Sequence, residues 1–235
     1  MTGNPAPTVL LTRPKAQAEA YAAELAAELH RPCPVMIAPL IEITPLAPAP
    51  ELEGIGTLLF TSTNGVAGLA ALTPRRDIPA LCVGERTAAR AEALGFRAIA
   101  AGGDADSLIA LARARGRGRL LYPRGQEVAR DLAAPLRDAG FELRELVVYR
   151  QTPRPLTAEA RALIAAGNPV LLPLFSPRSA RLFLERAARL DLSRVTAICL
   201  SENVAGALPA ARFSALCTAA APAASAVTRE IAARL

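Results

Sequence analysis

The feature that most constrains the fold of this chain is a regular alternation of short apolar runs with longer alanine-rich segments. The apolar runs are predicted to be buried strands: Val9–Thr12, Thr57–Thr61, Ala80–Val83, Arg119–Tyr122, Val170–Phe175 and Ala197–Leu200. The amphipathic segments between them are predicted to be helices: Lys15–Leu29, Gly65–Leu72, Thr87–Leu94, Ser107–Arg115, Glu127–Ala139, Ser179–Leu190 and Ala223–Leu235. This order predicts parallel sheets that are covered by helices on both faces.

A weak internal repeat indicates that the chain holds two such domains. The segment Ala80-Leu-Cys-Val-Gly-Glu aligns without a gap with Ala197-Ile-Cys-Leu-Ser-Glu. Two further pairs keep the same chain order: Leu10-Leu-Thr-Arg-Pro with Leu120-Leu-Tyr-Pro-Arg, and Phe60-Thr-Ser-Thr-Asn with Leu174-Phe-Ser-Pro-Arg. Each pair is a strand that turns into a helix, and 235 residues suit two small domains. We infer a duplication.

Two proline-flanked stretches do not fit the alternation. Pro39–Leu46 alternates apolar and polar residues with a period of two, and Leu146–Pro155 is similarly extended. Proline at their ends disfavours helix. They are either edge strands of the sheets or a pair of strands that connects two domains, and the residues alone do not decide between these alternatives.

Charge and polarity narrow the range of partners. The formal net charge is +6, and Lys15 is the only lysine, so the cationic residues are almost all arginines. Arginine binds carboxylates through its planar fork, which favours an anionic small molecule, although a biased gene composition would also enrich arginine. Nucleic-acid binding is not favoured, because aromatic residues make up only 4% of the chain and tryptophan is absent. No apolar run is long enough to span a membrane and no signal peptide is recognised, so we expect a cytoplasmic protein without membrane contact.

Motifs for cofactor chemistry are missing from the sequence. The four cysteines form no C-x-x-C pair and His30 is the only histidine, so no metal site is expected, and Cys82 and Cys199 are predicted to be buried thiols. There is no phosphate-binding loop, and Gly84-Glu-Arg-Thr is not a dinucleotide fingerprint. A Ser–His–Asp triad would depend on His30 alone. We therefore expect activity without metal, nucleotide or flavin.

Six predicted strand-to-helix turns carry hydroxyl, amide or arginine side chains. They are residues 12–14, 62–65, 84–87, 123–125, 176–179 and 201–203. In open parallel sheets ligands bind at the carboxyl ends of the strands, where a helix N-terminus offers unpaired amides and a positive partial charge. Six such turns around one cleft would form a site for carboxylates. For each Ser, Thr or Asn taken singly, the alternative is simple capping of the helix.

The succession of these motifs along nearly the whole chain resembles the uroporphyrinogen-III synthase family. The matching segments are Leu11-Thr-Arg-Pro14, Pro39-Leu-Ile-Glu-Ile43, Phe60-Thr-Ser-Thr-Asn-Gly-Val66, Val83-Gly-Glu-Arg-Thr-Ala88, Leu121-Tyr-Pro-Arg-Gly125, Val147-Val-Tyr-Arg-Gln-Thr152, Leu174-Phe-Ser-Pro-Arg-Ser179 and Ala197-Ile-Cys-Leu-Ser201. The last motif departs from the family, because Ser201-Glu-Asn-Val204 stands where many members have Gly-Pro-Thr-Thr. Asn203 still offers a hydrogen-bond donor there.

The resemblance implies an α/β fold of two similar doubly wound parallel-sheet (flavodoxin-like) domains joined by a two-stranded β-ladder linker. The expected first domain is discontinuous and comprises residues 1–37 plus 155–235. The expected second domain comprises residues 46–145, and the linker strands comprise 38–45 and 146–154. Such an arrangement implies hinge motion between the domains.

The resemblance also implies that the chain closes the linear tetrapyrrole hydroxymethylbilane into uroporphyrinogen III, with loss of water and inversion of ring D. Tyr149 matches the family tyrosine proposed to protonate the departing hydroxyl, and the alternative is an aromatic residue that stabilises a strand. The implied substrate-binding residues are Arg13, Ser62, Asn64, Gly84, Arg86, Arg124, Ser176, Arg178, Ser179, Ser201 and Asn203. We expect a monomer, with transient contact to the preceding pathway enzyme. The alternative function is a non-catalytic two-domain binding protein for an anionic small molecule.

Overall fold

The computed structural model describes residues 6–29, 32–127 and 131–235. Their strands are β1 (Thr8–Leu11), β2 (Val35–Ile37), β3 (Ile41–Pro45), β4 (Ile55–Phe60), β5 (Ala80–Cys82), β6 (Ala98–Ala100), β7 (Arg119–Gly125), β8 (Leu143–Pro153), β9 (Val170–Leu174), β10 (Val195–Cys199) and β11 (Ala215–Thr218). Their helices are α1 (Lys15–Glu28), α2 (Thr63–Leu72), α3 (Glu85–Ala93), α4 (Ala105–Arg115), α5 (Ala133–Asp138), α6 (Ala158–Ala165), α7 (Pro177–Arg186), α8 (Glu202–Ala205) and α9 (Ala224–Ala232), with a short 3-10 helix at Ala210–Arg212.

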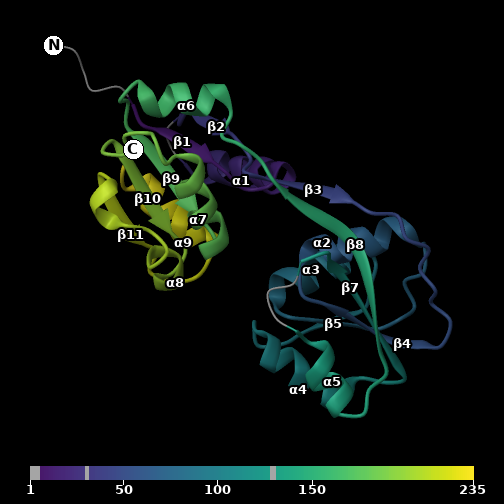
Figure 1. Ribbon diagram of the computed structural model, residues 1–235. Helices are drawn as coiled ribbons and strands as arrows, with labels where there is room; N and C mark the ends of the chain where they lie inside the picture. Colours follow the sequence, from purple (N-terminus) through teal and green to yellow (C-terminus); the bar gives the residue numbers. More distant parts are fainter. Residues whose placement is uncertain (1–5, 30–31, 128–130) are drawn as a thin grey trace. The chain divides into compact units, whose positions relative to one another are not determined.

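The chain forms two compact units, and one of them is discontinuous in sequence. Unit 1 consists of Met1–Glu42 and Thr152–Leu235, and unit 2 consists of Ile43–Gln151. The chain passes from unit 1 to unit 2 through β3 and returns through β8 (Figure 1). These boundaries lie within six residues of those expected from the resemblance.

Strands β3 and β8 pair with each other, and β8 also pairs with β7. Leu46 N donates to Val148 O at 2.9 Å and Arg154 N donates to Leu40 O at 2.8 Å, so β3 and β8 run antiparallel. Strand β8 runs parallel to β7. The interpretation as a connecting pair holds, because the β3–β8 pair carries the two chain crossings. The edge-strand interpretation holds for β3 alone, since β8 lies between β3 and β7.

The two sheets have the same spatial order of parallel strands. In unit 1 the order is β2-β1-β9-β10-β11, and in unit 2, after the antiparallel β3, it is β8-β7-β4-β5-β6. Numbered along the chain, unit 1 has the flavodoxin-like order 2-1-3-4-5, and unit 2 is a circular permutation of it. The three repeated sequence pairs fall on strands at equivalent positions, β1 with β7, β9 with β4 and β10 with β5. The predicted fold class is confirmed.

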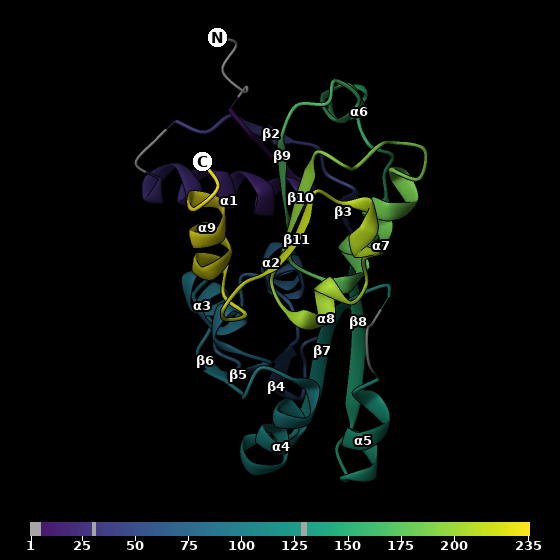
Figure 2. The same cartoon turned by 90° about the vertical axis from the view of Figure 1, so that its left-hand side faces the viewer.

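Helices cover the sheets from both sides, as parallel sheets require (Figures 1 and 2). In unit 1, α1 and α9 pack on one face through Tyr21, Leu25 and Ile231. In unit 2, α2 and α3 cover one face around Phe60, whereas α4 and α5 cover the other around Leu59. The side chains of these two neighbouring residues of β4 therefore pack into cores on opposite faces of the sheet, because successive side chains of a strand alternate in direction.

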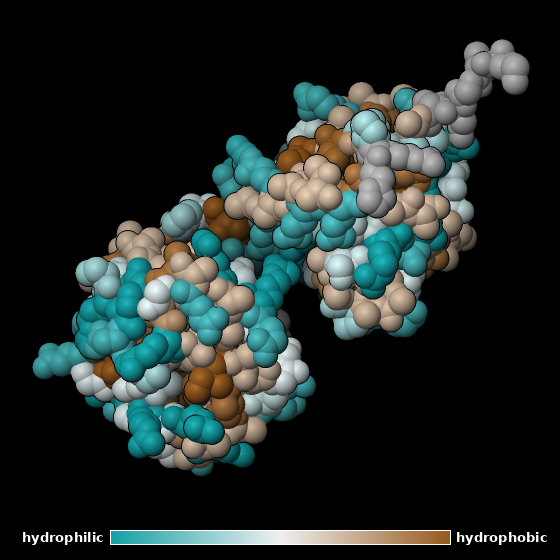
Figure 3. All heavy atoms as spheres, turned by 180° about the vertical axis from the view of Figure 1, so that it is seen from behind, coloured by the Kyte–Doolittle hydropathy of each residue, from teal (hydrophilic) through white to brown (hydrophobic). Residues whose placement is uncertain are grey.

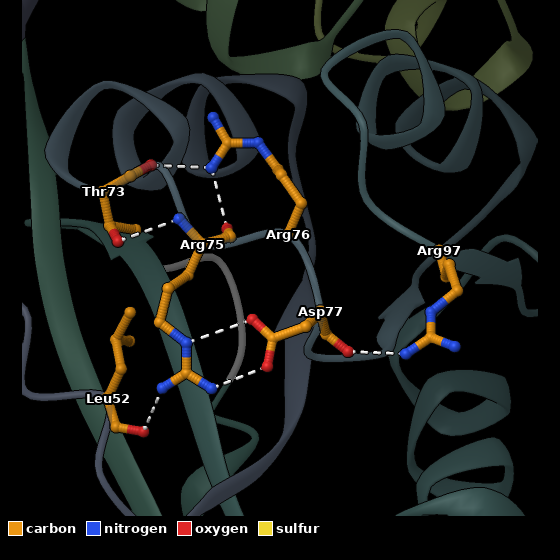
Figure 4. A network of polar contacts seen from close by, with 6 residues as sticks. All are labelled: Leu52, Thr73, Arg75, Arg76, Asp77 and Arg97. Carbon is orange, nitrogen blue, oxygen red and sulfur yellow. Dashed lines mark hydrogen bonds and ion pairs between the residues drawn. The ribbon is translucent and has the colours of Figure 1, made fainter.

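An arginine network lies at the carboxyl end of α2 (Figure 4), and one of its members, Arg76, also binds the carboxyl end of α3. Arg76 donates to Ala70 O at 3.1 Å and Thr73 O at 2.6 Å in the first helix end, and to Leu94 O at 2.6 Å in the second. Its guanidinium carbon lies 4.6 Å from the centre of the Phe96 ring. One cation therefore satisfies last-turn carbonyls of two helices, where the helix dipoles are negative.

Two sequence expectations need correction. Residues Pro123–Gly125 are not a turn, because β7 continues to Gly125 by pairing with β8 after its pairing with β4 ends at Leu121. Pro123 is tolerated there since that stretch has a partner on one side only. The helix expected at Glu127–Ala139 is shorter, and its described part starts at Ala133, whose N–H bonds Asp131 Oδ1 at 2.7 Å. Residues 128–130 of that expectation lie outside the described residues.

Sequence analysis also missed short elements: β2, β6, β11, α6 and α8. Strands of three or four residues at sheet edges are only partly buried and lack a long apolar run. Among the described residues, the exposed large hydrophobic side chains are Val35 in β2 and Ile99 in β6. On the face drawn in Figure 3, hydrophilic residues are interspersed with apolar patches. Within the described ranges, no helix is long and apolar enough to cross a membrane.

Candidate functional site

The predicted binding turns gather at one edge of each sheet. In unit 1, residues 12–14, 176–179 and 201–203 follow the adjacent strands β1, β9 and β10. In unit 2, residues 62–65, 84–87 and 123–125 follow or end the adjacent strands β4, β5 and β7. Because the carboxyl ends of parallel strands share an edge, the structure brings the six segments together as two sets of three. Each set lies at the point where its strand order reverses direction, where α/β sheets bind ligands.

In unit 2 the central feature is a pair of hydroxyl groups at the start of α2. Ser62 Oγ and Tyr149 Oη lie 3.2 Å apart, within hydrogen-bond distance. Ser62 also caps the helix, since its Oγ accepts from Gly65 N at 3.0 Å. The Tyr149 side chain is 7% exposed, whereas Ser62 is half-buried. The phenol is thus fixed at the positive end of a ten-residue helix.

A β-bulge in β8 directs the Tyr149 side chain. Arg124 of β7 pairs with Val147, but the next residue, Gly125, pairs with Tyr149 and skips Val148. In an unbroken strand two consecutive side chains point to opposite faces, and a bulge removes that alternation. Accordingly Val148 and Tyr149 both lie in the core between the sheet and α2. No sequence pattern signals this bulge.

A second tyrosine in the same unit lies on the other face of the sheet. Tyr122 is 3% exposed and belongs to the core under α4 and α5. Its hydroxyl is 3.0 Å from Thr61 Oγ1, and burial raises its pKa above the ordinary value. Tyr122 therefore ties the end of β4 in place.

The predicted binding residue Arg124 has partners within its own unit. Its Nε donates to Glu145 Oε1 at 2.6 Å, and one terminal nitrogen donates to Gly125 O at 2.8 Å and Gln126 O at 3.2 Å. The side chain is 18% exposed. These bonds hold the end of β7 against β8, so Arg124 shapes this edge of the sheet.

In unit 1 a stacked arginine occupies the equivalent position. The Arg13 guanidinium carbon lies 4.1 Å from the centre of the Phe175 ring and 5.9 Å from that of Tyr21. Arg13 also donates to Gln17 Oε1 at 3.4 Å. The two rings meet edge to face at 5.0 Å, and Tyr21 Oη lies 3.1 Å from Thr228 Oγ1. The cation–π attraction holds the guanidinium over the ring, and its planar fork can form a bidentate bond to a carboxylate. Sequence analysis identified Arg13 but missed its aromatic support.

Two predicted serines lie beside it at the start of α7. Ser176 Oγ accepts from Ser179 N at 3.1 Å and donates to Ser179 Oγ at 2.9 Å. Ser176, like Ser62, is thus a helix cap, which was the alternative given to each hydroxyl. Capping and ligand binding are compatible, since both groups remain half-buried at a helix N-terminus.

The remaining predicted binding residues lie on the same two edges. Gly84 is the N-cap residue of α3, and Ser201 is that of the four-residue α8, without a capping bond from its side chain. The half-buried members of this group are Asn64 and Arg178, and the exposed ones are Arg86 and Asn203. His30, the residue on which a triad would depend, lies outside the described residues.

Groups of three or more His, Cys, Asp or Glu side chains that would hold a metal are not found among the described residues. Cys82 and Cys199 are buried, as expected, and burial raises the pKa of Cys82 to about 12 and that of Cys199 to about 11. Both thiols are therefore protonated at neutral pH.

Comparison with known proteins gives one family and one fold. The sequence model of the family described as uroporphyrinogen-III synthase HemD matches residues 21–229. The fold is similar to the crystal structure of uroporphyrinogen-III synthetase from Helicobacter pylori 26695, with a TM-score of 0.66 and 20% identity over 97% of this chain and 99% of that one. It is also similar to a mutant uroporphyrinogen III synthase from Thermus thermophilus, with a TM-score of 0.57 and 19% identity over 96% of this chain and 97% of that one. Curated protein sequences give no match.

Proposed function

The chain belongs to the uroporphyrinogen-III synthase family, and from this membership we propose how its own residues carry out the reaction. The family match over residues 21–229 is the observation that carries the function. The reaction is the cofactor-independent closure of hydroxymethylbilane, with loss of water and inversion of ring D, which supplies uroporphyrinogen III to heme biosynthesis.

We propose that Tyr149 is the acid of the first step. The electron pair of the ring A nitrogen expels the hydroxyl group, whose oxygen takes the Tyr149 proton and leaves as water. Ring A loses its N–H proton to water and becomes an azafulvene. The contact between Tyr149 Oη and Ser62 Oγ supports this role, because Ser62 can donate its own hydrogen to the phenolate while accepting from Gly65 N. The positive end of α2 favours the same negative charge.

Ring D then attacks the azafulvene through its substituted carbon, and the spirocyclic pyrrolenine that forms breaks open and recombines with ring D inverted. The ring A nitrogen takes a proton back from water when the azafulvene is attacked, and the α proton that ring D loses on final ring closure returns the phenolate to phenol. A phenol is a weak acid at neutral pH, so the precise placing of the two ends of the substrate contributes most of the catalysis.

We propose that the acetate and propionate groups of the bilane bind at the two sets of turns. Arg13 is the best-supported contact, because its guanidinium lies over the ring of Phe175, the residue before the N-cap of α7. Ser176 and Ser179 offer hydroxyls at the same helix end. Arg124 serves indirectly, by holding the end of β7. The cytoplasmic location, the monomeric state and the transient contact with the preceding enzyme stay predictions.

The acid role is tested by Tyr149→Phe, which removes one oxygen and keeps the ring. We expect kcat to fall roughly ten- to a hundredfold while KM changes little, since the lost interaction is made in the transition state. Tyr122→Phe is the matched control, because it removes a buried phenol oxygen from the same unit on the opposite face of the sheet. Turnover and isomer ratio should be measured for both variants.

Full kcat and purely inverted product from Tyr149→Phe would show that Tyr149 only stabilises β8. Equal losses from both variants would show a general effect of hydroxyl removal. The non-catalytic alternative is decided by the unsubstituted chain in the same assay, since a binding protein would not accelerate loss of the bilane.

A further inference from the structure

Gly125 lies against the reacting end of the Tyr149 side chain. The bulge in β8 pairs these two residues across the β7–β8 ladder. A Cβ atom at Gly125 would lie 2.7 Å from Tyr149 Cζ, 2.8 Å from Cε2 and 3.0 Å from Oη. These separations are shorter than van der Waals contact, so a side chain at position 125 and the present phenol cannot occupy their positions together.

The backbone conformation at position 125 gives no other reason for glycine. The glycines with positive φ are Gly54, Gly95, Gly103, Gly118, Gly140 and Gly167 within the described ranges, and Gly125 is not one of them. Glycine is therefore required at this position by the close approach of the ring.

The two backbones beside the contact are held in place, so they cannot easily separate to relieve a clash. Gln126 N donates to Tyr149 O at 2.9 Å, directly past the glycine. The carbonyl of Gly125 itself accepts from Arg124, which is in turn bound to Glu145. An added methyl group would consequently displace the Tyr149 ring, and with it the hydroxyl that meets Ser62.

We propose that Gly125 is a positioning residue for the reaction: its missing side chain, together with the bulge opposite, fixes the Tyr149 hydroxyl at the start of α2. This inference rests on the proposed acid role of Tyr149. The inference also gives Arg124 an indirect role, because its side chain donates to the Gly125 carbonyl and so holds the peptide against which the phenol lies.

The test is a double-mutant cycle with Gly125→Ala and Tyr149→Phe, read as kcat, KM and isomer ratio. Gly125→Ala should lower kcat on the order of ten- to a hundredfold with little change in KM, because a displacement of about 1 Å has effects of that size. Adding Gly125→Ala to Tyr149→Phe should lower kcat no further, since the hydroxyl it misplaces is already gone. The same fall in kcat in both backgrounds would overturn the inference.

Gly116→Ala is the control for a methyl group forced into unit 2. Its Cβ would lie 2.5 Å from Ala112 O, at the end of α4, and β7 separates it from Gly125. This variant should lose stability and keep the kcat of the folded protein. Loss of kcat equal to that of Gly125→Ala would attribute the effect to strain and overturn the inference.

If Gly125→Ala does not fold, the contact itself still gives a test. Gly125→Ala combined with Tyr149→Ala should regain the stability of Tyr149→Ala alone, because the ring that the methyl group meets is absent. No such rescue would refute the contact. Failure of the acid role looks different: Tyr149→Phe would keep full kcat while Gly125→Ala still altered stability.

Discussion

The residues at the carboxyl-end edges of the two sheets, where the strand order reverses, differ in their chemistry. In unit 1 the equivalent edge presents a stacked cation, Arg13, and two linked hydroxyls. In unit 2 it presents a phenol on a helix N-terminus, and its arginine is bound to Glu145. We infer that the edge in unit 1 is suited to binding carboxylates and the edge in unit 2 to protonating a hydroxyl group.

Replacement of Arg13 tests the first half of that division. Arg13→Ala should raise KM roughly ten- to a hundredfold, the range for loss of a charge-assisted bond, and should increase the uninverted isomer because ring D is held less well. Arg13→Lys should restore little, since an ammonium group cannot make a bidentate bond in the stacked plane. Lys15→Ala removes the same charge two residues away from an exposed side chain and should leave KM unchanged. Equal KM for Arg13→Ala and Lys15→Ala would refute the contact.

Buried acidic protons predict a loss of stability at alkaline pH. Burial raises the pKa of Cys82 to about 12 and of Cys199 to about 11, and it raises those of Tyr21 and Tyr122. An unfolded cysteine titrates at about 8.5, so above that pH the unfolded chain loses protons that the folded chain keeps. The stabilisation is complete below pH ~8.5 and is lost as the pH rises toward the folded pKa values. Urea unfolding should show the free energy of unfolding falling from about pH 8.5 to about pH 10.5. The slope should be smaller in a Cys82→Ala, Cys199→Ala double variant, and an unchanged slope would contradict this origin.

The site residues show how far sequence reasoning reached. Arg13, Ser62, Ser176 and Tyr149 were found because they stand at strand ends or match a family motif, and their binding and catalytic roles stay predictions. The dependence of Tyr149 on Gly125 was not predictable. It arises from a one-residue bulge that changes which side chains meet, and neither residue marks that bulge in the sequence.

At the scale of helices and strands, central strands were predictable and edges were not. A buried strand such as β4 or β9 leaves a continuous apolar run, whereas β6 and β11 have partly exposed residues. The extension of β7 through Pro123 was unpredictable for another reason. It depends on which neighbouring strand has already ended, which is a property of the whole sheet.

The arginine network, part of which is drawn in Figure 4, predicts that the stability of α2 and α3 depends on Arg76. Arg76→Ala should lower the free energy of unfolding by about 2 kcal/mol, because it leaves helix-end carbonyls of both elements without their charged donor. Arg76→Lys should recover only part of this, since one ammonium group cannot reach Ala70, Thr73 and Leu94 together. Native-state hydrogen exchange should locate the loss in α2 and α3.

Arg75→Ala is the matched control for Arg76→Ala. Arg75 forms an exposed pair with Asp77, whose pKa it lowers to about 2, and also bonds Leu52 O. Exposed pairs contribute little to stability, so this variant should change unfolding far less. A loss as large as that of Arg76→Ala would show that the network acts through charge and not through the helix ends.

For the whole molecule, the strand order explains why the repeat was detectable along the chain. The three repeated pairs lie on equivalent strands, yet unit 1 begins its sheet with β1 and unit 2 begins with β4. Along the chain, however, β1, β2, β4, β5 and β6 occupy the same succession of sheet positions as β7, β8, β9, β10 and β11, so the three pairs keep their order. The discontinuous first unit was expected only from the family resemblance. Local secondary-structure propensities do not determine which strands join the same sheet.

The central claim is that this chain closes hydroxymethylbilane with ring D inverted. The most direct test is the isomer composition of the product when purified protein acts on hydroxymethylbilane, beside a sample without protein. Closure without enzyme gives the uninverted isomer, so identity of the product separates catalysis from simple binding. We predict that uroporphyrinogen III is the main product and that it forms faster than the uncatalysed isomer. Uninverted product at the rate of the protein-free sample would contradict the account.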